Sequence, residues 1–186
     1  MREDMEIFLV RHGEAAASWS EAPDPGLSEC GRRQAEHTAK LLMRKVSDDI
    51  RLLSSPLRRA IETAEPLANR LRQAVLVEEA FREIPSPVPL AQRQQWLRQF
   101  MQQQWHGQEE ELTTWRTNTL QRLFHLQHPA VVFTHFLVIN TVVGYALDRP
   151  ETLHFWPANG SITQLRRVGD KLELLALGEE VKTVVN

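Results

Sequence analysis

The sequence predicts an α/β fold: a three-layer sandwich with a mainly parallel central sheet, helices on both faces and an antiparallel edge strand. Short apolar runs alternate with segments of helical periodicity along the chain, and this order places strands parallel in one sheet. Near the end, Ser161–Arg166 and Lys171–Leu177 have strand character and flank the turn Val168-Gly169-Asp170, which indicates an antiparallel hairpin. The length of 186 residues suits one hydrophobic core, so we expect a single domain over residues 1–186.

Three strands and two helices are predicted in the first part of the chain. Glu6–Val10 is a short apolar run, which indicates a strand. Ser28–Lys45 begins with a typical helix N-cap and repeats apolar residues at helical spacing. Arg51–Ser54 is the next predicted strand, and Pro56–Leu67 is a predicted helix whose proline fits the first turn. Ala74–Val77 is the third predicted strand.

The second part begins with an irregular loop. Ile84–Leu90 holds three prolines and is not expected to form regular structure. Leu90–Gln104 and Glu109–Leu126 repeat apolar residues at helical spacing. Ala130–Thr134 is an uninterrupted β-rich run, which is typical of a strand buried on both faces. His135–Leu147 is the last predicted helix.

Composition and charge exclude several classes of protein. Apolar residues make up 42% and charged residues 25% of the chain, which is ordinary for a soluble globular protein. The net charge of −2 argues against a general nucleic-acid binder. The single cysteine, Cys30, excludes an intramolecular disulfide and a cysteine-based zinc site.

We expect a cytoplasmic protein that does not bind membranes. The segment Met1–Glu6 holds three acids and one arginine and is unlike the start of a signal peptide. No apolar run approaches the roughly 20 residues that span a bilayer. Nothing in the sequence ranks a surface for oligomerisation.

Charged and polar residues follow several of the predicted strands. Arg11 and His12 follow the first strand, Arg59 lies one turn into the helix after the second, Glu83 comes after the third, and His135 follows the fourth. Ligands of such sheets bind at the carboxyl ends of the strands, so we expect these residues to converge. Arginine suits phosphate oxygens, a helix N-terminus after the fourth strand favours an anion, and histidine can act as a nucleophile. The arrangement is consistent with phosphoryl transfer.

Six blocks of the sequence also resemble, in order, the histidine phosphatase superfamily, which includes the cofactor-dependent phosphoglycerate mutases. Their bounds are Phe8–Glu14, Leu27–Ala35, Ser54–Ala64, Phe81–Ile84, Val131–His135 and Asn159–Thr163.

The resemblance implies a role for each matching residue. His12 resembles the nucleophile that forms a phosphohistidine, in which a backbone carbonyl usually fixes the tautomer. Arg11 and Arg59 resemble the phosphate clamps, and His135 the second histidine that helps to hold the phosphate oxygens. Glu83 resembles the general acid that protonates the leaving oxygen and later activates water. The resemblance implies no metal and no cofactor.

The sequence departs from the family pattern at a few positions. Ala17 and Ser18 stand where several members have Trp and Asn, and Ser18 is the residue here that could donate a hydrogen bond to phosphate. Phe136 stands where the family usually has glycine after the second histidine. The region Pro85–Gly107, which reads the leaving group, resembles the family least. The chain is shorter than a typical mutase and lacks the long insert that holds a bisphosphate, which favours hydrolysis.

We therefore expect a phosphomonoesterase of the histidine acid phosphatase type, acting without metal through His12 on a small phosphorylated substrate. A phosphoprotein substrate is the alternative, with the enzyme acting on phosphohistidine in signalling. Mutase activity and a non-catalytic phosphate-binding domain are the remaining interpretations, and the presence of both histidines with both arginines disfavours the last.

Overall fold

The computed structural model describes residues 4–18 and 22–182. In this part of the chain, six strands form one sheet in the order β3-β2-β4-β1-β5-β6. The strands β1 to β4 are mutually parallel, β5 runs antiparallel to β1, and β6 runs antiparallel to β5. Their bounds are β1 Met5–Arg11, β2 Arg51–Ser54, β3 Val75–Val77, β4 Ala130–Thr134, β5 Ile162–Val168 and β6 Lys171–Ala176. The predicted mainly parallel sheet with an antiparallel edge is confirmed.

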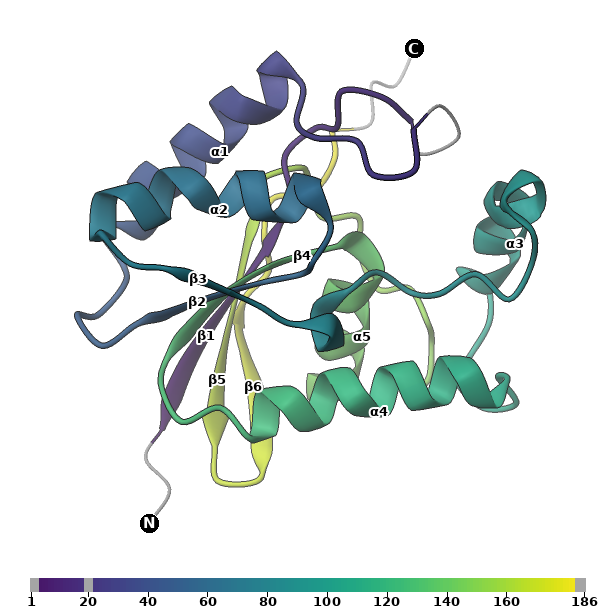
Figure 1. Cartoon of the computed structure of the whole chain (residues 1–186). Coiled ribbons are helices and arrows are strands. Elements are labelled where there is room, and N and C mark those ends of the chain that lie inside the picture. The colour runs from purple at the N-terminus through teal and green to yellow at the C-terminus, as the bar shows by residue number, and fades with distance from the viewer. Residues whose placement is uncertain (1–3, 19–21, 183–186) are drawn as a thin grey trace.

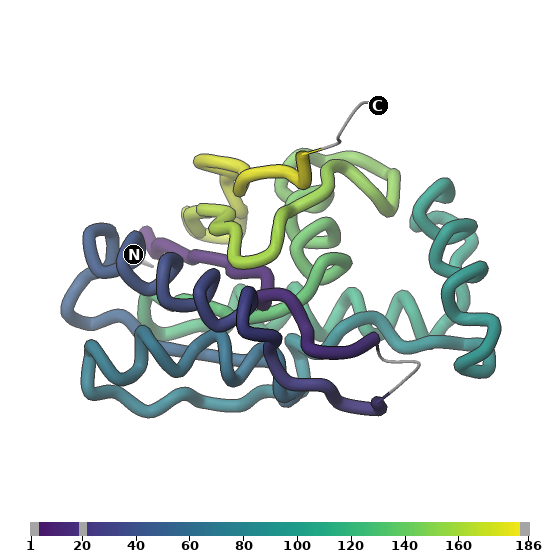
Figure 2. Tube along the Cα trace, turned by 90° about the horizontal axis from the view of Figure 1, so that it is seen from above, coloured from purple at the N-terminus to yellow at the C-terminus, as the bar shows by residue number. Residues whose placement is uncertain are grey.

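Helices cover both faces of this sheet and complete the three layers. Helices α1 and α2 lie on one face, and α4 and α5 lie on the other (Figure 1). Helix α3 lies to the side of the sheet in both views (Figures 1 and 2). The helix bounds are α1 Glu29–Leu42, α2 Arg58–Leu71, α3 Arg93–Phe100, α4 Glu110–Phe124 and α5 Phe136–Ala146, with 3₁₀ turns η1 Glu79–Phe81 and η2 Leu90–Gln92. No helix of the described ranges has the length and apolar character needed to cross a bilayer.

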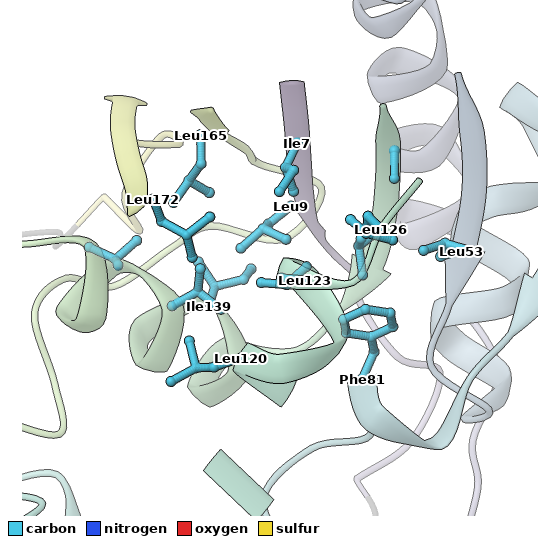
Figure 3. Close-up of a cluster of buried hydrophobic side chains, with 14 of the residues drawn as sticks. Ile7, Leu9, Leu53, Phe81, Leu120, Leu123, Leu126, Ile139, Leu165 and Leu172 are labelled. Carbon is cyan, nitrogen blue, oxygen red and sulfur yellow. The ribbon is translucent and has the colours of Figure 1, made fainter. Parts of the chain in front are cut away.

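Strand β1 divides its side chains between two hydrophobic cores. Ile7 and Leu9 pack into the core beneath α4 and α5 (Figure 3). Phe8 and Val10 pack into the core beneath α1 and α2. All four side chains are fully buried. Because both faces of the strand lie under helices, the sequence shows a continuous apolar run there instead of an alternating pattern.

Helix α2 begins at Arg58, so the prediction that Pro56 occupies its first turn is wrong. Leu57 is the N-cap residue, and its N–H donates to Ser55 Oγ at 3.2 Å. The N–H of Arg58 donates to the Asp24 carboxylate at 2.9 Å. The acceptor for the first turn therefore comes from a loop 34 residues away, which no local pattern reveals.

The predicted helix Leu90–Gln104 is also wrong in its second part. Gln104 leaves the helical path and forms an isolated bridge with Glu151. The N–H of Trp105 donates to the carbonyl of Pro150 at 2.9 Å. The residues predicted to form the end of the helix therefore pair with the segment after α5. The apolar spacing alone favours continuation of the helix, because it carries no information about this distant segment.

Candidate active site

The carboxyl ends of three parallel strands bring the predicted residues to one edge of the sheet. The N–H of His12 donates to the carbonyl of Thr134 at 3.0 Å, and the N–H of Ser55 donates to the carbonyl of Phe133 at 2.9 Å. His12, Ser55 and His135 therefore leave β1, β2 and β4 at the same level. This is the position at which such sheets bind ligands.

The two ring nitrogens of His12 have different partners. Nδ1 lies 2.7 Å from the carbonyl of Gly13, which can only accept, so Nδ1 holds the proton. Nε2 accepts from Nε of Arg59 at 3.1 Å and so keeps its lone pair. Burial, reinforced by the positive charges of Arg59 and Arg11, lowers the pKa of His12 to about 3. The imidazole is therefore neutral at physiological pH, with Nε2 available as a nucleophile.

Several contacts fix the loop after β1. The N–H of Gly13 donates to Thr63 Oγ1 at 2.9 Å, and the Asn159 amide donates to the carbonyl of His12 at 3.0 Å. An added Cβ at Gly13 would lie 2.6 Å from the carbonyl oxygen of Gly31, so this approach requires glycine. The carbonyl that determines the His12 tautomer is thus held in place.

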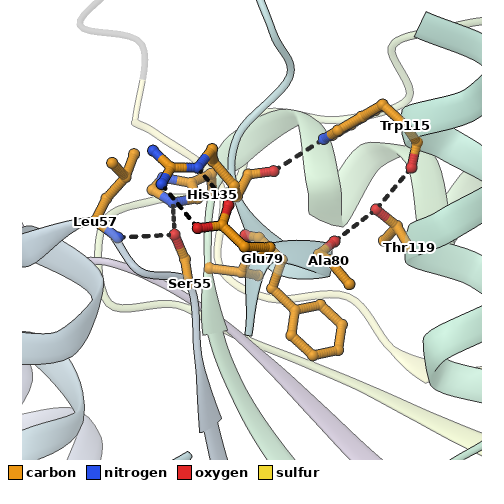
Figure 4. Close-up of polar contacts among 10 residues, drawn as sticks. Ser55, Leu57, Glu79, Ala80, Trp115, Thr119 and His135 are labelled. Atoms are coloured by element: carbon orange, nitrogen blue, oxygen red, sulfur yellow. Dashed lines mark hydrogen bonds and ion pairs between the residues drawn. The ribbon is translucent and has the colours of Figure 1, made fainter. Parts of the chain in front are cut away.

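His135 is almost completely buried and is oriented by a serine. Its Nε2 lies 2.7 Å from Ser55 Oγ (Figure 4), and its Nδ1 lies 3.5 Å from a terminal guanidinium nitrogen of Arg59. Arginine can only donate, so Nδ1 is the acceptor and Nε2 holds the proton. The rings of His12 and His135 are 5.2 Å apart at an angle of 61°. Burial, with His12 as the next cause, lowers the pKa of His135 well below its usual range.

Replacing Ser55 with alanine is expected to lower kcat/KM for a phosphate monoester about tenfold. The change removes the hydrogen bond that orients the His135 ring, and one such bond contributes about 1.5 kcal/mol. Ser54→Ala is the matched control, because Ser54 Oγ is buried in the adjacent position but donates to the Ser55 carbonyl. Equal losses in the two variants would indicate a general packing effect and contradict the orienting role.

Two arginines lie near His12. Arg59 donates to both histidines. One terminal nitrogen of Arg11 donates to the carbonyl of Pro157 at 2.7 Å, while its Nε is buried without a partner among the described residues. Both guanidinium groups remain charged at neutral pH, although burial lowers the pKa of each. The site therefore presents two positive charges beside a neutral nucleophile, which suits an anion such as a phosphoryl group.

Glu83 lies at the N-terminus of α5. Its two carboxylate oxygens accept from the N–H of Leu137 at 3.1 Å and from the N–H of Ile84 at 3.0 Å. The helix N-terminus that the sequence suggested for a bound anion thus holds this carboxylate. Burial raises the pKa of Glu83, although the two N–H groups and the charges of Arg93 and Arg59 oppose that shift. A carboxyl group with a raised pKa beside a phosphate site is suited to general acid catalysis.

The segment that leads to Glu83 is fixed to its surroundings through successive carbonyl groups. The carbonyls of residues 80–82 accept, in order, from Thr119 Oγ1 at 2.8 Å, Thr134 Oγ1 at 2.7 Å and the Trp115 indole at 2.9 Å. Figure 4 shows the contacts of Thr119 and Trp115 from α4. The backbone that leads to Glu83 is therefore placed by β4 and α4 together.

Sequence reasoning gave no role to four residues of this arrangement. Ser55, Thr63 and Asn159 lie within the blocks that resemble the family, but no role was assigned to them. Arg93 lies in the region without recognisable motifs, where nothing singled it out; it donates to the Ile84 carbonyl at 3.1 Å. Ser18, the predicted phosphate donor, lies exposed in the loop after β1, where its carbonyl accepts from Ala22 at 3.2 Å, and its role stays a prediction.

The ligands that a metal site needs are not gathered in the described residues. Within residues 4–18 and 22–182, no group of three or more His, Cys, Asp and Glu side chains could hold a metal ion. The polar groups gathered at the sheet edge are instead the two arginines, the two histidines and Glu83.

The free energy of unfolding is expected to fall as the pH is lowered, because the buried His12 is neutral in the folded protein. Its pKa is about 3 when folded and near 6.5 when unfolded, so the stability that it contributes is present above 6.5 and is lost as the pH falls toward 3. Denaturant titrations at several pH values in phosphate-free buffer give the free energy of unfolding as a function of pH. Between pH 3 and 6.5, this free energy should change less steeply in His12→Asn than in the wild type, by about 1.4 kcal/mol per pH unit. Parallel slopes would contradict the buried neutral state.

The chain is similar to known proteins along most of its length. The family model of the histidine phosphatase superfamily (branch 1) matches residues 7–180. The curated relatives include 6-phosphofructo-2-kinase/fructose-2,6-bisphosphatase 4 of Rattus norvegicus and of Homo sapiens, each 26% identical over 154 residues, covering 77% of this chain and 33% of the relative. The chain thus spans about a third of the length of these relatives.

Solved structures share the fold along almost the whole chain. A mycobacterial glucosyl-3-phosphoglycerate phosphatase superposes with a TM-score of 0.69 at 23% identity, covering 92% of this chain and 97% of that one. A phosphoserine phosphatase from Entamoeba histolytica, in complex with 3-phosphoglyceric acid, gives a TM-score of 0.69 at 20% identity, covering 96% and 98%. With the family match over residues 7–180, the chain belongs to the histidine phosphatase superfamily, branch 1.

Proposed function

We propose that this protein hydrolyses small phosphate monoesters through a phosphohistidine on His12, without a metal ion. The observation that supports this most directly is the state of the His12 ring, whose Nδ1–H faces the Gly13 carbonyl while Nε2 keeps its lone pair beside Arg59. A phosphate-binding domain has no need of a nucleophile prepared in this way. The similar structures of phosphatases for glucosyl-3-phosphoglycerate and phosphoserine also favour a small-molecule substrate.

In the first step, Nε2 of His12 attacks phosphorus and the bond to the leaving oxygen breaks. Arg11 and Arg59 neutralise the phosphoryl oxygens, with Arg59 leaving Nε2 to bind the substrate. Protonated Glu83 gives its proton to the leaving oxygen, which departs as an alcohol. The phosphorylated ring is a cation, and the Gly13 carbonyl that accepts from Nδ1 at 2.7 Å stabilises it.

In the second step, water attacks the phosphohistidine. Glu83 is now a carboxylate and takes a proton from the water as the oxygen bonds to phosphorus. The bond between phosphorus and Nε2 breaks, the lone pair returns to the ring, and inorganic phosphate leaves. Both His12 and Glu83 are then in their starting states, so the cycle consumes one ester and one water.

Hydrolysis of 4-nitrophenyl phosphate in the presence of a chelator tests this proposal. The wild type should release one inorganic phosphate for each nitrophenol, and His12→Ala purified in parallel should be inactive. Equal turnover in both preparations would mean a contaminant or another nucleophile. Faster turnover of a phosphohistidine protein than of small esters would favour the phosphoprotein alternative, and phosphate transfer to a second substrate instead of water would favour a mutase.

A further inference from the structure

Two aromatic side chains lie in line beside the clamp Arg11. The Arg11 guanidinium lies over the Phe136 ring, 5.3 Å from its centroid. The Phe136 ring in turn meets the Trp156 ring edge to face, with centroids 5.1 Å apart at 65°. The charged group of Arg11 is thus held by an aromatic ring and by the Pro157 carbonyl.

Trp156 is 50% exposed, so about half of its surface is open to solvent. Its backbone is nevertheless fixed on both sides. The N–H donates to a carboxylate oxygen of Glu180 at 3.1 Å, and the carbonyl accepts from the Val181 N–H at 2.9 Å. The next residue, Pro157, accepts from Arg11. The backbone that carries the indole is therefore fixed relative to the phosphate clamp, which lowers the ordering entropy that contact with a ligand would cost.

The apolar surface continues from Phe136 toward the predicted general acid. Phe136 packs against a hydrophobic cluster beneath α3 that includes Ile84. Ile84 directly follows Glu83 and gives it one of its two N–H contacts. A general acid must lie next to the leaving oxygen, and Phe136 contacts both the clamp Arg11 and the apolar cluster that includes the residue after the predicted general acid.

We propose that Phe136 and Trp156 form an apolar platform for the leaving group, so that the preferred substrates are phosphate monoesters with a flat apolar group next to the ester oxygen. The inference rests on the proposed function. In this arrangement the face of the Phe136 ring supports the Arg11 guanidinium that binds the phosphoryl group. The exposed indole of Trp156 then contacts the apolar group of the substrate. Offset or edge-to-face contact with such a ring should strengthen binding about three- to tenfold.

The test measures binding of two non-hydrolysable ligands by titration calorimetry, phenylphosphonate and methylphosphonate. They present the same anionic group and differ in the apolar ring, so the ratio of their dissociation constants reports the platform. The wild type should bind phenylphosphonate about tenfold more tightly. Trp156→Ala and Phe136→Leu should each reduce this ratio several-fold, and Trp156→Phe should restore most of it.

Phe124→Leu is the matched aromatic control. Phe124 meets Tyr145 edge to face at 5.8 Å, and its carbonyl accepts from Arg167, which pairs opposite Met5 at the other end of β1. This variant should keep the wild-type ratio.

The possible results separate the apolar platform from the proposed hydrolysis. A ratio near one in the wild type, or a ratio that Trp156→Ala and Phe136→Leu leave unchanged, would overturn the platform while the proposed hydrolysis stands. Failure to bind either phosphonate, together with no turnover of an aryl phosphate, would overturn the proposed function and the platform with it. An equal loss for both ligands in Trp156→Ala would mean that the residue only positions Arg11, which also contradicts a platform.

Discussion

Replacing His12 with alanine is expected to lower kcat for phosphate monoesters by about 10⁴- to 10⁶-fold, the range found when a covalent nucleophile is removed. The neutral ring with a free Nε2, held by Gly13 and Arg59, is the group here that could take the phosphoryl group. KM should change little by comparison, because Arg11 and the released Arg59 still bind the phosphate. Steady-state kinetics with an aryl phosphate measures the effect.

His37→Ala is the control for this substitution. His37 lies exposed on α1, away from the sheet edge that holds the site, so its loss should leave kcat within about twofold of the wild type. A His12→Ala enzyme that retains a tenth or more of the wild-type rate would contradict the assignment of His12 as the nucleophile. Circular dichroism and thermal unfolding would show whether the variant keeps the fold.

Replacing Glu83 with glutamine is expected to lower kcat/KM by about 10²- to 10⁴-fold for alkyl phosphates, the usual contribution of a general acid. Glutamine keeps the size of the side chain but cannot give a proton to the leaving oxygen. The loss in kcat/KM, which covers the steps up to phosphorylation of His12, should be smaller for 4-nitrophenyl phosphate, because nitrophenolate leaves readily without a proton. An equal loss of kcat/KM for both substrates would indicate disturbed packing at α5 instead of lost acid catalysis.

The pH profile gives a second test of Glu83. Burial raises its pKa above the usual range of a glutamate, so the protonated form that the first step needs persists to higher pH. The rate of that step should then fall as the pH rises through the raised pKa, and Glu83→Gln should lack this fall. Glu79→Gln is the control, because Glu79 pairs with Arg82 on the exposed side of η1 and should keep the wild-type profile.

The strands were predictable because burial on both faces leaves a plain sequence signal. The predicted strand Ala130–Thr134 coincides with β4, and all five of its residues are buried. The site residues that follow strand ends converge for the same reason, since parallel strands deliver their next residues to one edge. Arg11, His12 and His135 therefore lie together, as the sequence predicts. Their catalytic roles remain predictions until the variants are measured.

Features that depend on distant segments could not be predicted. The first turn of α2 is capped by Asp24 from a remote loop, so the proline signal pointed to the wrong residue. The apolar spacing of Leu90–Gln104 favours a longer helix than the one that forms, because the chain turns to pair with Pro150 and Glu151. Arg93 lies near the general acid through the packing of α3, which no motif marks.

The most direct test of the phosphohistidine mechanism is to trap the phosphorylated enzyme and locate its phosphate. The wild type and Glu83→Gln would be mixed rapidly with an activated aryl phosphate, quenched in alkali, and mapped by mass spectrometry and ³¹P NMR. Glu83→Gln should accumulate more phosphoenzyme, because it lacks the base that activates water. We expect phosphate on Nε2 of His12 in both proteins. Phosphate on His135, on Nδ1 of His12 or on any other residue would contradict it.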